Sequence, residues 1–137
     1  MKSILITGLS GSGKTTFSKS LITELQKKYI VDYFNADEIR TKYDDWDFSQ
    51  AGRQRQLERM IHFKNTSNND IVIFDFICPK ESFRKLLSAD TVVWMDTIKN
   101  SRYEDTDQIF ESPTFYSYRV TDWSQSAKII SEIASLV

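Results

Sequence analysis

The chain has 137 residues, of which 40% are apolar, and its 18 basic and 19 acidic side chains give a formal net charge of −1. The apolar residues suffice for one packed core, so we expect a single domain over residues 1–137. The near-neutral charge argues against a dedicated nucleic-acid coat or a polybasic membrane binder, and a single cysteine excludes an intrachain disulfide framework.

The sequence also argues against contact with a membrane. No apolar run approaches the roughly 20 residues that span a bilayer. The N-terminal segment carries one lysine and a short apolar run, but it continues into a glycine loop rather than into a small-residue cleavage site. We therefore expect a cytoplasmic protein.

Short apolar runs alternate with stretches of helical periodicity along the chain. In chain order, the pattern predicts strand 3–7, helix 15–28, strand 30–35, helix 36–43, helix 50–65, strand 71–77, helix 81–88, strand 91–95, strand 116–120 and helix 124–136. This alternation predicts an α/β fold with a mainly parallel sheet of about five strands and helices on both faces. Ligands in such sheets bind at the carboxyl ends of the strands.

The turn after the first strand carries a phosphate-binding motif. The residues from Gly8 to Thr15 match G-x-x-x-x-G-K-[ST] at every required position, and three of the four glycines of the chain lie within it. An apolar strand precedes the motif and an amphipathic helix follows, as in P-loop NTPases. The residues predicted to bind the phosphates are Gly8, Ser10, Gly11, Ser12, Gly13, Lys14, Thr15 and Thr16.

The chemistry of this motif predicts ATP and Mg²⁺ as cofactors. Glycines let successive backbone N–H groups point at phosphate oxygens, and the N-terminus of the following helix adds partial positive charge. Lys14 would neutralise β- and γ-phosphate oxygens, and the hydroxyl of Thr15 would ligate Mg²⁺. These features predict the donor and do not identify the acceptor.

Two carboxylates lie near the predicted strand ends. Asp75 follows four apolar residues, which is typical of a second nucleotide motif that places a carboxylate near Mg²⁺. Because Phe76 and Ile77 continue the apolar run, we expect Asp75 inside the strand. Asp37 begins a helix, so it is either a capping or first-turn acid, or a group that accepts a substrate proton or holds the metal.

Residues after the P-loop resemble those of the adenylylsulfate (APS) kinases. The family pattern has a P-loop of the form GLSGSGKTT, which occurs here letter for letter, then GDNIR, FSxxDRxEN, an ISPY-like strand end and a lid containing FTG. The matching residues here are Ala36-Asp37-Glu38-Ile39-Arg40, Phe48-Ser49, Arg53, Ile77-Cys78-Pro79 and Arg84. The similarity runs from Lys2 to about Arg84 and fades afterwards.

The resemblance implies a role for each matching residue. Asp37 would be catalytic and associated with Mg²⁺, Arg40 and Arg53 would hold the phosphosulfate of the acceptor, and Phe48 would stack on its adenine. The remaining acceptor contacts would be Gln56, Ile77 and Cys78 through side chain or backbone, and Phe110 as a second stacking aromatic. The alternatives are that Arg53, Arg55 and Arg59 form one solvated helix face, and that the two phenylalanines are core residues.

The chain departs from the family pattern on the acceptor side. Gly52, Gln56 and Lys80 stand where the family has Asp, Asn and Tyr. The predicted lid, residues 97–113, is shorter than in the family, although Arg102 within it could still reach the transferring phosphate as a catalytic residue.

The first-choice function is therefore an ATP-dependent kinase of the sulfate-assimilation type, acting on the 3′-hydroxyl of adenylylsulfate. A nucleoside, nucleotide or modified-base/polynucleotide kinase on the same scaffold is the alternative, and only it would make a nucleic acid a partner. A non-catalytic nucleotide-binding protein is a further alternative, whereas a GTPase would need an N-K-x-D motif that the sequence lacks. For assembly, we consider a homodimer.

Overall fold

The computed structural model describes residues 2–137 and contains a five-stranded sheet. All pairings between neighbouring strands are parallel, and the strand order is β2-β3-β1-β4-β5. The strands are β1 (Lys2–Gly8), β2 (Val31–Asn35), β3 (Ile71–Asp75), β4 (Thr91–Met95) and β5 (Tyr118–Val120). This architecture confirms the predicted α/β fold, and it puts the strand that leads into the P-loop at the centre of the sheet.

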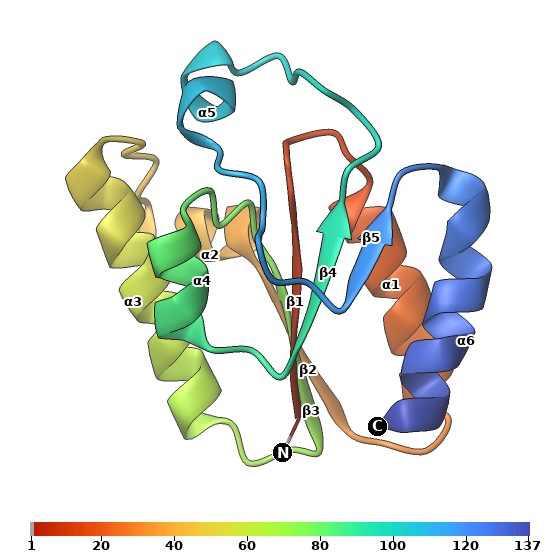
Figure 1. The fold of residues 1–137 in the computed structure, drawn as a ribbon. Helices are drawn as coiled ribbons and strands as arrows, with labels where there is room; N and C mark the ends of the chain where they lie inside the picture. The colour runs from red at the N-terminus through yellow and green to blue at the C-terminus, as the bar shows by residue number, and fades with distance from the viewer. Residues whose placement is uncertain (1) are drawn as a thin grey trace.

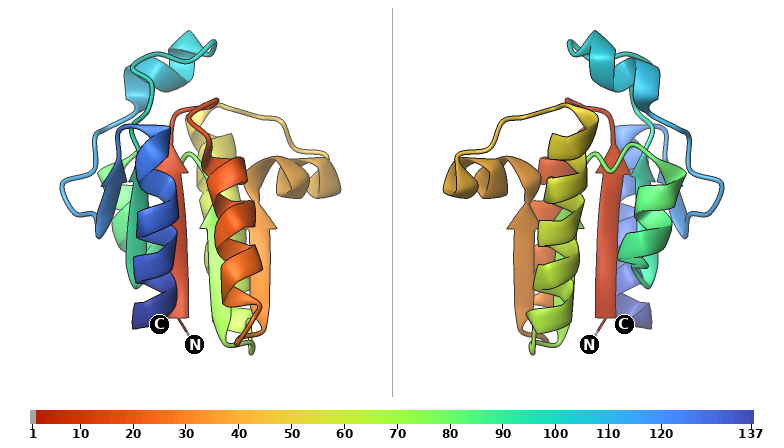
Figure 2. Two further views of the ribbon diagram at one scale, coloured as in Figure 1. Left: turned by 90° about the vertical axis from the view of Figure 1, so that its right-hand side faces the viewer. Right: turned by 90° about the vertical axis from the view of Figure 1, so that its left-hand side faces the viewer.

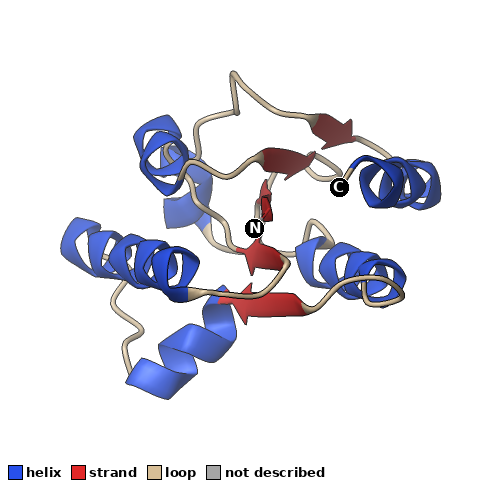
Figure 3. Ribbon diagram, turned by 90° about the horizontal axis from the view of Figure 1, so that it is seen from below, coloured by secondary structure: helices blue, strands red, loops and turns tan. Residues whose placement is uncertain are grey.

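Helices cover both faces of the sheet (Figures 1 and 2). They are α1 (Lys14–Leu25), α2 (Ala36–Tyr43), α3 (Gln50–Thr66), α4 (Glu81–Leu87), α5 (Glu104–Ile109) and α6 (Ser126–Leu136), with a 3₁₀ turn at Trp123–Gln125. Seen from below, the sheet lies between a layer of α1 and α6 and a layer containing α3 and α4 (Figure 3). No helix among residues 2–137 is long and apolar enough to cross a membrane.

The alternation of side chains along β1 divides the core into two halves. Ile4 and Ile6 pack with Phe17 and the other apolar residues of α1 and α6, whereas Leu5 packs with Leu57 and the apolar residues of α3 and α4. All residues of β1 from Ser3 to Gly8 are buried, as expected for the central strand of a parallel sheet with helices on both sides.

Two elements differ from the sequence-based expectations. The third strand ends at Asp75 rather than at 77, so Asp75 lies at the carboxyl end of β3 and not inside it. Cys78 has a left-handed backbone (φ 45°) and precedes a proline, so the chain turns away from the sheet there. The sequence analysis missed α5, since its residues are mostly polar and give no apolar stripe. In Figure 1, α5 lies beyond the carboxyl ends of the strands.

Candidate active site

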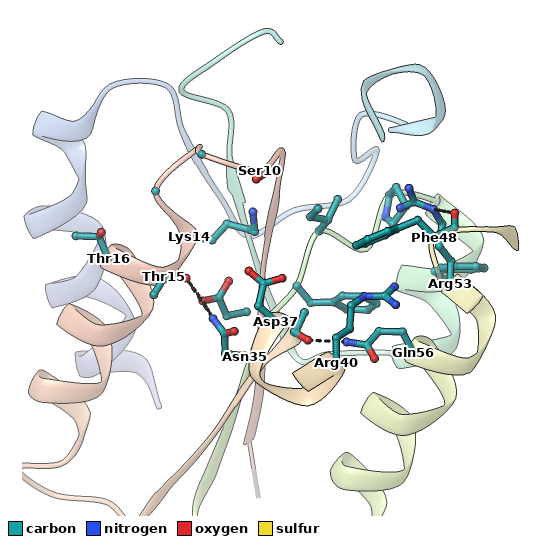
Figure 4. Close-up of a pocket in the computed structure, with 18 residues that line it drawn as sticks. Ser10, Lys14, Thr15, Thr16, Asn35, Asp37, Arg40, Phe48, Arg53 and Gln56 are labelled. Carbon is teal, nitrogen blue, oxygen red and sulfur yellow. Dashed lines mark hydrogen bonds between the residues drawn. The ribbon is translucent and has the colours of Figure 1, made fainter. Parts of the chain in front are cut away.

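A cavity of about 370 Å³ lies at the carboxyl ends of the central strands. Figure 4 shows the P-loop residues on one side of this cavity, Arg40, Phe48, Arg53 and Gln56 on the other, and Asp37 between them. The walls come from the P-loop, the starts of α2 and α3, and the turn after β3; their residues are Ser10, Gly11, Gly13, Lys14, Thr15, Thr16, Asn35, Ala36, Asp37, Arg40, Phe48, Arg53, Gln56, Asp75, Phe76, Ile77, Pro79 and Phe83.

The P-loop has the conformation that its glycines allow. Gly13 has φ 96°, and a Cβ there would lie 2.9 Å from a ring carbon of Trp123, so the position excludes a side chain on two grounds. Gly8 and Ser12 lie behind the cavity wall rather than in it. A Cβ at Gly8 would lie 2.5 Å from the carbonyl oxygen of Met95, and the carbonyl of Ser12 accepts a hydrogen bond from Thr97 Oγ1 at 2.7 Å. Both residues therefore shape the loop from outside the cavity.

Lys14 holds its ammonium group at the cavity. Its Nζ donates to the carbonyl oxygen of Leu9 at 2.9 Å. Burial lowers the pKa of Lys14, and the negative charges of Asp75 and Asp37 oppose this shift. A phosphate anion in the cavity would favour the charged form of Lys14 further.

One oxygen of the Asp75 carboxylate accepts three hydrogen bonds. Its Oδ2 accepts from Thr15 Oγ1 at 2.6 Å, from the hydroxyl of Tyr33 at 2.6 Å and from Asn35 Nδ2 at 3.0 Å. Burial and the hydrogen bond to Asp75 raise the pKa of Tyr33, so the phenol keeps its proton and is the donor. The Thr15 hydroxyl likewise gives its proton to Asp75, and its oxygen accepts from Asn35 Nδ2 at 3.2 Å, which leaves one lone pair of that oxygen for a cation.

This donor set fits Mg²⁺. Residues 2–137 contain no cluster of three or more His, Cys, Asp or Glu side chains that would form an all-protein cage. Mg²⁺ is usually held by one or two protein oxygens together with water and substrate phosphates. Thr15 Oγ1 and the carboxylate of Asp75 supply two such oxygens beside the P-loop.

Asp37 lines the cavity and is not the cap of its helix. The N-cap of α2 is Asn35, whose Oδ1 accepts a hydrogen bond from the backbone N–H of Glu38 at 3.1 Å. The cap therefore leaves the exposed carboxylate of Asp37 free for another role. Asp37 stands in the first turn of α2, between the P-loop and the arginines (Figure 4).

Two arginines bring positive charge to the opposite wall. Arg40 is 5% exposed, donates to the carbonyl oxygens of Asp45 and Asp47, and lies 4.4 Å from the centroid of the Phe48 ring. Arg53 donates through Nε to the carbonyl oxygen of Phe48 at 2.8 Å and lies 5.4 Å from the same ring centroid. Burial lowers the pKa of Arg40, and repulsion from Arg53 contributes to this shift.

These two guanidinium groups form no ion pair with any acid among residues 2–137, whereas the two other arginines of α3 do. Arg55 and Arg59 form ion pairs with Asp45, with nitrogen–oxygen distances of 3.0 and 2.6 Å. The arginines of α3 are therefore not one solvated face: two fix the loop before the helix, and Arg53 turns into the cavity. Because neither Arg40 nor Arg53 is held in an ion pair, both guanidinium groups can bind an anion in the cavity.

Gln56 lines the cavity and has partners for both ends of its amide. Its Nε2 donates to the carbonyl oxygen of Ala36 at 2.9 Å, and its Oε1 accepts from Arg59 at 3.2 Å. With 1% of its surface exposed, Gln56 joins the start of α2 to α3. The side chain therefore supports the wall that carries Asp37.

Gly52 makes room for the loop that carries Phe48. A Cβ at position 52 would lie 2.0 Å from the carbonyl oxygen of Asp47. We expect Gly52→Ala to destabilise the protein by about 1–3 kcal/mol, because backbone must move to relieve the clash. Urea unfolding measures this change. Ala51→Ser, at the exposed neighbouring position, should change the free energy of unfolding by less than about 0.5 kcal/mol, and equal stability of the two variants would contradict the interpretation.

The side chain of Cys78 does not line the acceptor pocket, which leaves only its backbone for the predicted contact. Its side chain is completely buried in the core under α3 and α4, and its flanking residues Ile77 and Pro79 line the cavity instead. The left-handed backbone at Cys78 turns the side chain inward, and its carbonyl oxygen accepts from Arg84 Nε at 3.1 Å. Burial raises the pKa of the thiol to about 12, so Cys78 is no nucleophile.

Two residues of the segment 97–113 also lie elsewhere than predicted. Phe110 lies over the guanidinium of Arg84 at 5.2 Å and lines a separate cavity of about 230 Å³ beside the end of β4, not the main cavity where the acceptor was expected. Arg102 is exposed, lies over the ring of Tyr103 at 5.0 Å and does not reach the main cavity. Lacking a clear pattern, this segment could not be placed from the sequence.

Sequence reasoning missed three residues that the fold brings to the site. Tyr33 and Asn35 contact Asp75 from β2, and Thr106 of α5 accepts a hydrogen bond from Arg53 Nη2 at 3.2 Å. The period of two along β2 places Tyr33 and Asn35 on one face, directly before Asp37, and this was the available signal. No local pattern marks Thr106.

Known proteins resemble this chain in sequence. A family model described as adenylylsulphate kinase matches residues 1–100. A probable adenylyl-sulfate kinase of Pseudomonas aeruginosa is 28% identical over 102 residues, which cover 72% of this chain and 48% of that protein. Protein KTI12 of Saccharomyces cerevisiae is 32% identical over 100 residues, covering 66% of this chain and 32% of that protein. The chain thus spans about half the length of the curated adenylyl-sulfate kinases that it matches.

A solved structure shares the fold over nearly the whole chain. The APS kinase CysC of Mycobacterium tuberculosis, in complex with AMPPNP and APS, superposes with a TM-score of 0.78 at 22% identity, covering 98% of this chain and 96% of that one. With the P-loop, the fold and the family match in agreement, the chain belongs to the adenylylsulphate kinase family of P-loop proteins.

Proposed function

We propose that this protein is an ATP-dependent kinase that transfers the γ-phosphoryl group to a hydroxyl of an anionic, nucleotide-like acceptor. The 3′-hydroxyl of adenylylsulfate is the first choice. One observation carries the proposal: a single cavity joins the P-loop and Lys14 on one wall to the unpaired guanidinium groups of Arg40 and Arg53 on the other. The family match supports the same assignment.

The donor half would hold the triphosphate of ATP. Backbone N–H groups of the P-loop and the N-terminus of α1 bind the phosphates, and Lys14 exchanges its hydrogen bond to Leu9 for phosphate oxygens. Thr15 and Asp75 would hold Mg²⁺, which when bound supplies charge neutralisation on the phosphate oxygens. We also propose that residues 97–113 act as the lid, with Arg53 tying α5 to the acceptor wall through Thr106.

Asp37 would serve as the base of the transfer. The acceptor hydroxyl would lie between Asp37 and the γ-phosphoryl group, in line with the bond to the leaving oxygen. As the new oxygen–phosphorus bond forms, the hydroxyl proton passes to the Asp37 carboxylate, and the bond to the β-phosphate oxygen breaks to release ADP. Lys14 stabilises the charge that develops on the transferred group.

The acceptor wall favours an anion attached to a planar ring. Arg40 and Arg53 offer guanidinium donors that suit phosphate or sulfate oxygens. Phe48 is 49% exposed beside them and provides an apolar surface for a base. Adenylylsulfate combines these two features. KTI12 shares sequence with this chain although it is not named as an adenylyl-sulfate kinase, so the shared motifs do not identify the acceptor. A nucleoside, nucleotide or modified-base/polynucleotide kinase is therefore the second candidate.

An acceptor panel tests the proposal. ATP radiolabelled in its γ-phosphoryl group is incubated with the protein, Mg²⁺ and, in turn, adenylylsulfate, AMP, adenosine and an RNA oligonucleotide. We expect the highest kcat/KM with adenylylsulfate. Labelling of adenosine or the oligonucleotide, with adenylylsulfate unlabelled, would transfer the assignment to the second candidate.

Removing the charge of Arg53 should weaken binding of the acceptor selectively. A hydrogen bond to a charged group contributes about 1.5–3 kcal/mol, so we expect Arg53→Gln to raise the acceptor KM by roughly 10- to 100-fold while the KM for ATP stays unchanged. Steady-state kinetics with each substrate varied in turn measure both constants. Arg119→Gln is the control, since Arg119 is paired with Asp96 outside the main cavity. An unchanged acceptor KM in Arg53→Gln would remove this residue from the acceptor site.

A further inference from the structure

The hydrogen bonds around Asp75 form a closed cluster that the proposed function does not use in full. Besides donating to Asp75, Asn35 Nδ2 lies 3.2 Å from Thr15 Oγ1 and 3.3 Å from the hydroxyl of Tyr33. The four side chains come from β2, β3 and the start of α1. Donors from two elements, α1 and β2, thus fix one carboxylate oxygen of β3, Oδ2.

The two oxygens of this carboxylate differ in their surroundings. Oδ2 accepts all three hydrogen bonds, and Oδ1 accepts none from residues 2–137. A carboxylate fixed in this way cannot rotate freely, so Oδ1 also keeps one orientation, and Asp75 is among the residues that line the main cavity. The Thr15 oxygen is oriented by the same cluster, because its proton is committed to Oδ2.

We propose that Tyr33 and Asn35 are positioning residues for the magnesium ion: they fix Asp75 and Thr15 before the metal arrives and so strengthen the coupling between metal and nucleotide. The inference rests on the proposed binding of Mg²⁺ and nucleotide at the P-loop. Groups that orient metal ligands typically change metal affinity by about 10- to 100-fold when removed.

The chain offers variants that remove single donors with little change in packing. The Tyr33 ring packs against the core under α1 and α6, so Tyr33→Phe keeps this contact and loses only the hydroxyl. Asn35→Ser loses the Nδ2 donor but keeps an oxygen that can cap α2. Tyr29→Phe is the matched control, because the Tyr29 hydroxyl donates to the carbonyl oxygen of Val137, away from the cavity.

The test is the dissociation constant of ADP, measured by calorimetry with Mg²⁺ and again with EDTA. The ratio of the constant in EDTA to the constant with Mg²⁺ measures the coupling between metal and nucleotide without any turnover. We expect Tyr33→Phe and Asn35→Ser each to reduce this ratio by about tenfold, with the constant in EDTA unchanged within about twofold. Tyr29→Phe should keep the ratio of the wild type.

The possible outcomes separate this inference from the proposed function. If both variants keep the ratio of the wild type, the positioning role is overturned and the kinase proposal stays intact. Equal weakening of ADP binding in both media would also overturn it, since a general structural defect would be the cause. A wild type that binds ADP equally well with and without Mg²⁺ would contradict both proposals.

Discussion

Lys14→Ala is expected to reduce kcat for phosphoryl transfer by about 10³-fold. Lys14 is the cation of the donor wall, and its Nζ donates to the carbonyl oxygen of Leu9. Loss of one preorganised donor at a developing negative charge typically costs about 10²–10³-fold in kcat, and this donor also carries a full charge. Initial rates of ADP release with MgATP and saturating acceptor measure the effect.

The control for Lys14 is an exposed lysine of the same helix. Lys19→Ala removes the same charge from α1 at a position outside the cavity, and its kcat should stay within about twofold of the wild type. A thermal melt of both variants shows whether the fold is kept. Transfer at the wild-type rate by a folded Lys14→Ala variant would contradict the placement of the γ-phosphoryl group beside this residue.

Asp37→Asn is expected to lower kcat by about 10²–10⁴-fold while ADP still binds. The amide is close in size to the carboxylate but cannot accept the hydroxyl proton, so the loss should appear in the chemical step. Because Asn35 caps α2, replacing Asp37 should leave the helix in place. Single-turnover rates and ADP calorimetry measure the two quantities separately.

Glu38→Gln provides the matched control for Asp37. Glu38 is the next residue of the same first turn and lies outside the cavity. Its variant loses the same charge near the helix N-terminus, so any general electrostatic effect appears in both. A similar loss of kcat in the two variants, or a normal rate in Asp37→Asn, would remove Asp37 from the role of base.

The features that the sequence predicted correctly depend on local patterns. The P-loop motif, the alternation of strands and helices, and the position of Asp37 at the start of α2 follow from residues close together in the chain. The end of β3 was misplaced because the apolar run continues for two residues beyond Asp75, and only the turn at Cys78 shows where the chain leaves the sheet.

The remaining features depend on contacts between distant parts of the chain. Tyr33 and Asn35 become part of the site only because β2 and β3 pair in a register that sets Asn35 beside Asp75. Phe110 contacts Arg84, which also donates to the carbonyl oxygens of Pro79 and Glu111. Neither the strand register nor this arginine contact leaves a pattern in the local sequence.

The transfer of label from γ-labelled MgATP to adenylylsulfate tests the central claim most directly. The account predicts that label appears in adenylylsulfate in an amount equal to the ADP formed, and that Lys14→Ala gives neither product. Formation of ADP without transfer of the label to adenylylsulfate would contradict the proposed transfer to this acceptor.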